Sequence, residues 1–397
     1  MRGGPVGESR STGHWRRAGF AGAAIGVLAA GAAAGVAVER LTVGRSVRQK
    51  ARLALDSAGP YGGLRGTPGR ALADDSTVLY YEVEEVADGA EPARRRRLFG
   101  RREPAPVTVV FSHGYCLNQD SWHFQRAALR GLVRTVHWDQ RGHGRSGHGV
   151  SQGGPDGVPV TIDQLGRDLK AVLDAAAPEG PLVLVGHSMG GMTVMALAER
   201  YPELIRDRVA GVAFVGTSAG KLGEVSYGLP IAGVNAVRRV LPGVLRALGS
   251  QTELVERGRR ATADLFAGLI KKYSFASKDV DPAVVRFAER MIESTPIDVV
   301  AAFYPAFAEH DRAAALSVLA EVPVLALAGD HDLVTPSSHT EAIAAVLPGA
   351  ELVIVPDGGH LVMLEHPEAV TDRLADLLVR AGAAPGAETA GTDPGRG

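Results

Sequence analysis

Short apolar runs separated by turn residues recur along most of the chain. Runs of five to seven mostly apolar residues are typical of strands buried in a sheet; they cover residues 77–83, 107–112, 133–138, 181–185, 209–215, 322–328 and 351–355. Stretches with helical spacing stand between several of these runs, at residues 120–130, 192–201 and 367–381 and in a stretch that starts at Thr161. Strands that alternate with helices predict parallel βαβ units, and therefore an α/β fold with a mostly parallel central sheet flanked by helices.

The alternation stops between residues 217 and 311. No strand pattern appears there, and helical patterns cover residues 234–248, 253–273, 282–293 and 297–309. A long helical insertion between two strands of an α/β sheet predicts a cap over the edge of the sheet that carries the chemistry. We therefore expect two core segments, 74–216 and 312–381, with the cap 217–311 inserted between them.

The first residues of the chain form a separate region. Residues 18–38 are 21 residues without a charge, between Arg16-Arg17 and Glu39-Arg40. This length suits a membrane-spanning helix. We expect an uncleaved anchor at the cell membrane after a tail of residues 1–17; a cleavable signal peptide that releases a secreted protein and a disordered leader are the alternatives. Because arginines stand on both sides of the stretch, the positive-inside rule predicts no orientation.

Three further segments lack core-forming patterns. Residues 39–73 are basic and then rich in Gly and Pro, which predicts a linker. Residues 87–106 contain six arginines within 94–102. We interpret this segment as a solvated, mobile surface loop, with binding to a membrane or an acidic partner as the alternative. Residues 382–397 are rich in Gly, Ala and Pro and predict a disordered tail.

Composition narrows the function classes. The 397 residues carry a formal net charge of −1, so no global charge indicates a nucleic-acid partner. Hydrophobic residues make up 45% of the chain, which is enough for a sizeable core. Cys116 is the single cysteine, which excludes an internal disulfide and a cysteine-based zinc site. No His, Asp and Glu cluster has metal-ligand spacing and no Gly-rich phosphate loop occurs, so we expect neither a metal nor a cofactor.

Candidate chemistry centres on the sequence Gly186-His187-Ser188-Met189-Gly190. A buried strand is predicted before it and a helix after it. A sharp turn between strand and helix presents a serine hydroxyl, while Gly186 and Gly190 remove the Cβ atoms that would keep the two elements apart. We interpret Ser188 as a nucleophile; a serine that only caps the helix is the alternative.

A serine hydroxyl becomes a good nucleophile when a base accepts its proton and a carboxylate orients that base. His360 follows the strand 351–355 and two glycines, in a loop before the last helix, which suits a base. Asp332, after the strand 322–328, is our candidate for the acid. We prefer it to Asp330, which directly follows the strand and is better placed to tie down the turn.

A negatively charged oxygen that develops on the substrate needs two preorganised hydrogen-bond donors. The backbone N–H of Met189, at the start of the predicted helix, is one candidate. The backbone N–H of Tyr115, in the loop after the strand 107–112, is the other. We interpret His113 and His143 as residues that fix their own loops rather than as bases.

The chain resembles the α/β-hydrolase superfamily over residues 74–381. The resemblance rests on His113-Gly114, residues 139–146, Gly186 to Gly191, Gly329 to Asp332 and Gly359-His360. It is similar to the capped branch that holds esterases, lipases and cofactor-free haloperoxidases. The resemblance implies an α/β-hydrolase fold with an inserted helical cap. It disfavours the epoxide hydrolases and haloalkane dehalogenases of the superfamily, which carry an aspartate where this chain has Ser188.

We therefore expect a hydrolase that cleaves carboxylic esters through an acyl-enzyme on Ser188. Apolar cap residues favour small-molecule esters with acyl or aryl groups, and they suit the cap's own core equally well; they are Leu265, Phe266, Leu269, Ile270, Phe287, Met291, Phe303 and Phe307. The alternatives are an acyltransferase or thioesterase with the same triad, a cofactor-free haloperoxidase-like enzyme, and a non-catalytic binding protein. No feature of the sequence predicts an oligomeric state.

Overall fold

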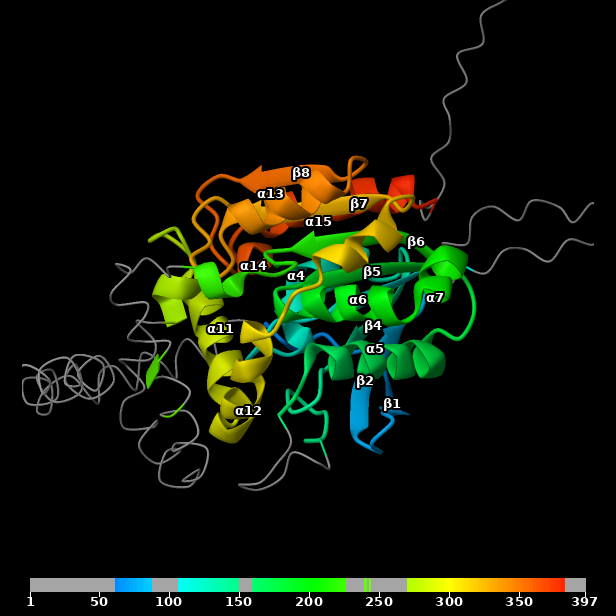
Figure 1. Ribbon diagram of the computed structural model, residues 1–397, viewed down its shortest axis with the longest axis horizontal. Helices are drawn as coiled ribbons and strands as arrows, with labels where there is room; N and C mark the ends of the chain where they lie inside the picture. Colours follow the sequence, from blue (N-terminus) through cyan, green and yellow to red (C-terminus); the bar gives the residue numbers. More distant parts are fainter. Residues whose placement is uncertain are drawn as a thin grey trace, which may run out of the picture.

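The computed structural model describes residues 61–87, 106–149, 159–225, 239–240, 243 and 270–382 of the chain. Its centre is an eight-stranded sheet with the strand order β1-β2-β4-β3-β5-β6-β7-β8 (Figure 1). Neighbouring strands from β4 to β8 are parallel, whereas β2 is antiparallel to both β1 and β4. The strands are β1 (Thr67–Leu72), β2 (Val78–Glu84), β3 (Thr108–Ser112), β4 (Arg134–Trp138), β5 (Leu182–His187), β6 (Val209–Val215), β7 (Val324–Gly329) and β8 (Glu351–Val355).

Every strand that the apolar runs predict is present, within two residues at its ends. The α-helices of the described residues are α4 (His123–Leu129), α5 (Ile162–Ala176), α6 (Met189–Arg200), α7 (Pro202–Arg208), α11 (Pro282–Ser294), α12 (Ile297–Ala308), α13 (Ser337–Val346), α14 (Val362–Glu365) and α15 (Pro367–Arg380). Short 3-10 helices cover Gln119–Trp122, Leu222–Glu224 and Ala313–Leu319. Thr161 caps α5 as predicted, because its side chain accepts a hydrogen bond from the N–H of Gln164.

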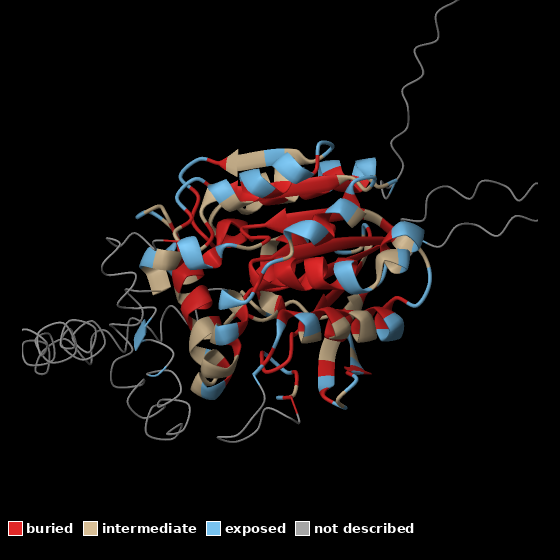
Figure 2. Ribbon diagram, in the orientation of Figure 1, coloured by how far each residue is buried: buried red, intermediate tan, exposed pale blue. Residues whose placement is uncertain are grey.

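The sheet has an apolar core on each face. Successive side chains of a strand point to opposite faces, so Leu184 of β5 packs in one cluster with residues of α5, α6 and α13. Val183 and Val185 of the same strand belong to a second cluster, with residues of α4, α11 and α15. Both layers of helices are needed to bury β5, whose six residues are all buried (Figure 2). This two-sided burial explains why the parallel strands read as continuous apolar runs rather than alternating ones.

The cap is helical in the part that the structure describes. Helices α11 and α12 match the patterns predicted at 282–293 and 297–309, and they lie together at one end of the sheet (Figure 1). Phe303 of α12 packs in an apolar cluster with Ile162 and Met192, near the beginnings of α5 and α6. The patterns predicted at 234–248 and 253–273 lie largely outside the described residues.

Strand β1 corrects the expected domain boundary. We expected the folded core to begin at residue 74 and residues 39–73 to form a linker, but β1 pairs with β2 along its whole length. Tyr61 also stacks on Phe287 of α11, with ring centroids 5.7 Å apart. Pro68 and Gly69 made this segment look like a loop. Pro68 is tolerated because β1 is an edge strand, where a proline can stand without an N–H. Gly69 leaves room for the ring of Tyr81 on β2, because a Cβ on Gly69 would lie 2.3 Å from that ring.

Several predicted segments lie outside the described residues. These are the membrane-spanning stretch 18–38 with the tail 1–17, most of the arginine-rich loop 87–106, and the C-terminal tail from residue 383 onward. Within the described ranges, none of the helices has both the length and the apolar character that a membrane crossing requires. The membrane anchor therefore stays a prediction.

Candidate active site

Ser188 lies on a strained turn between β5 and α6. Its backbone has φ +50° and ψ −119°, a region that a residue with a side chain rarely adopts. The turn is also very close-packed. A Cβ on Gly186 would lie 2.5 Å from the carbonyl oxygen of Gly190, and a Cβ on Gly190 would lie 2.2 Å from that of Ser112. Only glycine fits at either position. The Ser188 side chain makes no helix-capping hydrogen bond, which removes the reading of this serine as a helix cap.

Ser188, His360 and Asp332 form a hydrogen-bonded chain. The Oγ of Ser188 is 3.0 Å from Nε2 of His360. The other ring nitrogen of His360, Nδ1, is 2.8 Å from Oδ2 of Asp332. Because an ionised carboxylate only accepts hydrogen bonds, Nδ1 carries the ring proton and Nε2 is left free to accept the serine proton. The three side chains come from the carboxyl ends of β5, β7 and β8, where an open α/β sheet places its ligands.

The buried Asp332 carboxylate is held in place by its own loop. Its Oδ1 accepts hydrogen bonds from the N–H groups of Val334 and Thr335, both at 2.8 Å. The Thr335 hydroxyl donates to Oδ2 at 3.0 Å. Asp330 instead faces outward, with 37% of its side chain exposed, and accepts from the N–H of Gly358 at 3.2 Å. Of the two neighbouring aspartates, the one preferred from sequence is thus the one beside His360.

The two predicted oxyanion donors belong to segments that meet at Ser188. Met189 is the first residue of α6, so its N–H has no partner within the helix. Tyr115 follows Gly114, where an added Cβ would lie only 3.2 Å from the Cβ of Ser188 and 2.6 Å from Nδ1 of His187. The loop after β3 is therefore packed directly against the serine turn. The hydroxyl of Tyr115 donates to the carbonyl of Val300 in the cap helix α12, at 2.5 Å.

Ser188 opens onto a mostly apolar cavity of about 300 Å³. Residues of the core and of the cap line it together: Tyr115, Leu117, His187, Ser188, Ile270, Tyr273, Ser274, Ile292, Val334, His360 and Leu361. No Asp, Glu, Lys or Arg of the described ranges is among them. A cavity with this lining favours an uncharged, apolar group beside the serine.

His113 and His143 fix loops around the site, as we inferred from the sequence. His113 donates from Nδ1 to the carbonyl of Gly114 at 2.7 Å and accepts at Nε2 from the N–H of Gln140 at 2.9 Å. His143 accepts at Nε2 from the N–H of Cys116 at 3.1 Å. A ring nitrogen that accepts a hydrogen bond carries no proton, so the bonds at Nε2 of His113 and of His143 need neutral imidazoles. Burial lowers the pKa of His113 well below its ordinary value and that of His143 to about 4, so both rings are neutral at pH 7.

Sequence reasoning missed two supporting residues. His187 donates from Nε2 to the backbone carbonyl of His360 at 2.9 Å, and burial keeps the pKa of His187 well below its ordinary value. Thr335 supports the Asp332 carboxylate through both its N–H and its hydroxyl. His187 was visible only as the residue before the serine, and Thr335 only as part of a turn. Neither role has a local sequence signal, because each depends on contacts made in three dimensions.

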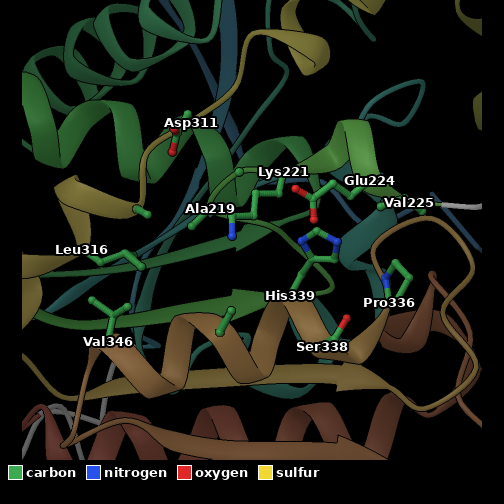
Figure 3. A pocket seen from close by; sticks show the side chains of 13 residues that line it. Ala219, Lys221, Glu224, Val225, Asp311, Leu316, Pro336, Ser338, His339 and Val346 are labelled. Atoms are coloured by element: carbon green, nitrogen blue, oxygen red, sulfur yellow. The ribbon is translucent and has the colours of Figure 1, made fainter. Parts of the chain in front are cut away.

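A second, larger cavity of about 540 Å³ lies beside α13. Lys221, Glu224, Asp311 and His339 contribute its charged or titratable side chains (Figure 3). Nδ1 of His339 is 2.8 Å from Oγ of Ser218. Ser218, however, is buried and does not line the cavity, and no carboxylate of the described residues is hydrogen-bonded to His339. The smaller cavity at Ser188 is therefore the candidate active site. The described ranges contain no group of three or more His, Cys, Asp or Glu residues that could hold a metal ion.

Comparison with known proteins agrees with this geometry. Residues 107–367, about two thirds of the chain, match the model of a family described as the alpha/beta hydrolase fold. The chain belongs to the α/β-hydrolase family. This membership confirms the resemblance to the α/β-hydrolase superfamily that the sequence motifs indicate.

Two curated proteins and one solved structure illustrate the relationship of this α/β-hydrolase to others. The dihydrolipoyllysine-residue acetyltransferase component of the acetoin cleaving system of Pseudomonas putida is 27% identical over 319 residues, which cover 77% of this chain and 75% of that protein. The 3-oxoadipate enol-lactonase 2 of Acinetobacter baylyi is 26% identical over 319 residues, which cover 76% of this chain and 98% of that protein. A thermophilic esterase from Thermogutta terrifontis superposes with a TM-score of 0.57 at 24% identity, over 79% of this chain and 98% of that one, and so shares the fold.

Proposed function

We propose that this α/β-hydrolase is a serine hydrolase that cleaves carboxylic esters with apolar acyl or aryl groups. The observation that carries the proposal is the hydrogen-bonded chain from Ser188 through His360 to Asp332, which opens onto a cavity without charged lining in the described residues. The relationship to an enol-lactonase supports it, because a lactone is a cyclic ester.

The proposed reaction has two acyl-transfer steps. In the first, Oγ of Ser188 attacks the carbonyl carbon of the ester while Nε2 of His360 takes the serine proton. The N–H groups of Tyr115 and Met189 stabilise the oxyanion. The C–O bond to the alcohol then breaks, and the alcohol leaves with the proton that His360 held.

In the second step, His360 accepts a proton from water as the water oxygen attacks the acyl-enzyme. The bond to Oγ of Ser188 breaks, the serine recovers the proton, and the carboxylic acid is released. Asp332 stays ionised throughout. It keeps the ring proton of His360 on Nδ1 and stabilises the positive charge that the imidazole acquires.

Hydrolysis of a series of p-nitrophenyl esters of increasing acyl length tests this proposal. We expect measurable kcat/KM for short and medium acyl chains in the wild type and loss of turnover in Ser188→Ala. Added alcohol distinguishes hydrolysis from acyl transfer, which the acetyltransferase among the relatives suggests as the alternative: an acyltransferase would form the new ester in preference to the free acid. A folded wild type that turns over no ester of the series would contradict the proposal.

We also propose that residues 18–38 anchor the protein in a membrane. The support is the stretch of 21 residues without a charge. Extraction of membranes at alkaline pH should leave the full-length protein in the pellet and release the double variant Val27→Arg, Leu28→Arg, because a charge at the centre of a spanning helix is costly. Release of both proteins alike would refute the anchor.

A further inference from the structure

Glu365 joins the loop of His360 to the cap. It is the last residue of α14, the short helix that follows His360, and α14 lies at the end of the sheet nearer to α11 (Figure 1). Its Oε2 accepts a hydrogen bond from the N–H of Gly359 at 2.7 Å. Its Oε1 accepts from the N–H groups of Ala276 and Ser277 at 2.9 and 2.7 Å. One carboxylate thus holds backbone donors from two segments that are more than 80 residues apart in sequence.

The cap segment 274–277 touches the His360 loop on both sides of the histidine. On one side, a Cβ on Gly359 would lie 2.7 Å from the backbone nitrogen of Ala276. On the other side, the N–H of Leu361 donates to the carbonyl of Ser274 at 2.8 Å. The position of this cap segment therefore determines the backbone positions of the two residues that flank His360.

Three backbone groups around His360, one from each of residues 359, 360 and 361, have hydrogen-bond partners in other segments. The Gly359 N–H is bonded to Glu365, the His360 carbonyl to His187, and the Leu361 N–H to Ser274. The partner of the first group is the only carboxyl group among the three, and hydrogen bonds to a carboxylate are about twice as strong as those between neutral groups. Glu365 is also the partner that reaches the cap and the loop at once.

We propose that Glu365 is a positioning residue for His360. Through Glu365, the position of the cap determines the position of the catalytic base. The inference rests on the proposed function and deepens it. Without the Glu365 carboxylate, the N–H groups of Gly359, Ala276 and Ser277 lose their acceptor. The cap segment and the loop keep the bond between Leu361 and Ser274 but lose the bridge at Gly359, and Nε2 of His360 moves away from Ser188. A misplacement of about 1 Å in a catalytic group can cost about 100-fold in rate.

The test compares Glu365→Ala and Glu365→Gln with Glu368→Ala. Glu368 stands three residues further along the chain, is exposed, and makes no hydrogen bond or ion pair with the described residues. Two rates are measured for each protein: phosphonylation of Ser188 by a small uncharged fluorophosphonate, and turnover of a p-nitrophenyl ester. Phosphonylation requires the base but few contacts with the cavity. A displaced His360 therefore lowers both rates.

We expect Glu365→Ala to lower kcat and the phosphonylation rate about 10- to 100-fold with KM changed less than about threefold. Glu365→Gln keeps one acceptor oxygen, so its rates fall between the alanine variant and the wild type. Glu368→Ala keeps wild-type rates. If Glu365→Ala does not fold, the intermediate rates of Glu365→Gln still carry the test.

Two results would overturn the inference in different ways. Wild-type rates in both Glu365 variants, or a lower melting temperature with unchanged rates, would leave Glu365 a structural residue while the proposed function stands. Absence of phosphonylation at Ser188 in the folded wild type would remove the proposed function, and the positioning role would fall with it.

Discussion

The Asp332→Asn substitution isolates the role of the carboxylate, because it changes charge and hydrogen-bonding capacity but hardly any volume. The Asp332 carboxylate accepts four hydrogen bonds: from two backbone N–H groups at Oδ1, and from the Thr335 hydroxyl and His360 at Oδ2. An asparagine oxygen can keep the two backbone bonds. Its NH₂ group, placed at the Oδ2 position, can only donate and therefore cannot accept the Nδ1–H of His360.

His360 is then expected to take the other tautomer, with Nδ1 accepting from the amide and the proton on Nε2. A ring nitrogen that carries a proton cannot accept another from Ser188. The same substitution in another serine, histidine and aspartate triad lowers kcat about 10⁴-fold, which corresponds to about 5.5 kcal/mol in the activation barrier. We expect a loss of this order in kcat/KM for a p-nitrophenyl ester. The retained backbone bonds keep the loop in place, so the loss comes from the changed tautomer of His360.

The control is Asp330→Asn, two residues away and outside the hydrogen-bonded chain. It should keep kcat/KM within about threefold of the wild type, since an asparagine oxygen can still accept the hydrogen bond from the N–H of Gly358, the bond that Asp330 makes to the His360 loop. Thermal unfolding of both variants shows whether the loop survives. If the folded Asp332→Asn protein loses less than tenfold in kcat/KM, Asp332 does not fix the tautomer of His360, and this assignment is refuted.

Two further predictions concern the surroundings of the serine. The first is a pH dependence: because the pKa of His143 is about 4 in the fold and about 6.5 in the unfolded chain, the unfolded state binds more protons between these values. The contribution of His143 to the free energy of unfolding is full above about pH 6.5 and is lost as the pH falls to about 4, by about 3 kcal/mol. Urea unfolding at pH 7 and pH 4.5 should show a smaller loss in His143→Gln, and equal losses in both proteins would contradict the assignment. The second concerns Gly190→Ala, whose Cβ would lie 2.2 Å from the carbonyl oxygen of Ser112; we expect esterase activity to fall about 100-fold or more because the serine must move. Gly349→Ala, where an added Cβ meets no atom within 4 Å, should keep its activity, and equal activity in the two variants would show that the turn tolerates a side chain.

The strands of the parallel part of the sheet could be predicted because burial on both faces leaves an unbroken apolar run. Strand β1 could not, because it is an edge strand in which Pro68 and Gly69 are tolerated and only part of the surface is buried. Its partner β2 was recognised because aromatic and β-branched residues dominate its sequence. For this reason the sequence predicts a core that begins at residue 74, whereas β1 begins at Thr67.

The candidate site divides in the same way. Ser188 and His360 stand in short sequence patterns whose glycines have a local geometric purpose, so their places could be predicted. The choice between Asp330 and Asp332 followed from the distance of each from its strand. His187, Thr335 and Glu365 could not be assigned, because their roles arise from contacts with backbone groups that the sequence alone does not bring together.

The most direct measurement of the central claim is the mass of the protein after reaction with a fluorophosphonate, followed by identification of the modified peptide. We predict one adduct per folded chain, on Ser188, and none in Ser188→Ala or His360→Ala. A folded wild type that takes up no label, or that is labelled equally in Ser188→Ala at a different serine, would contradict the account.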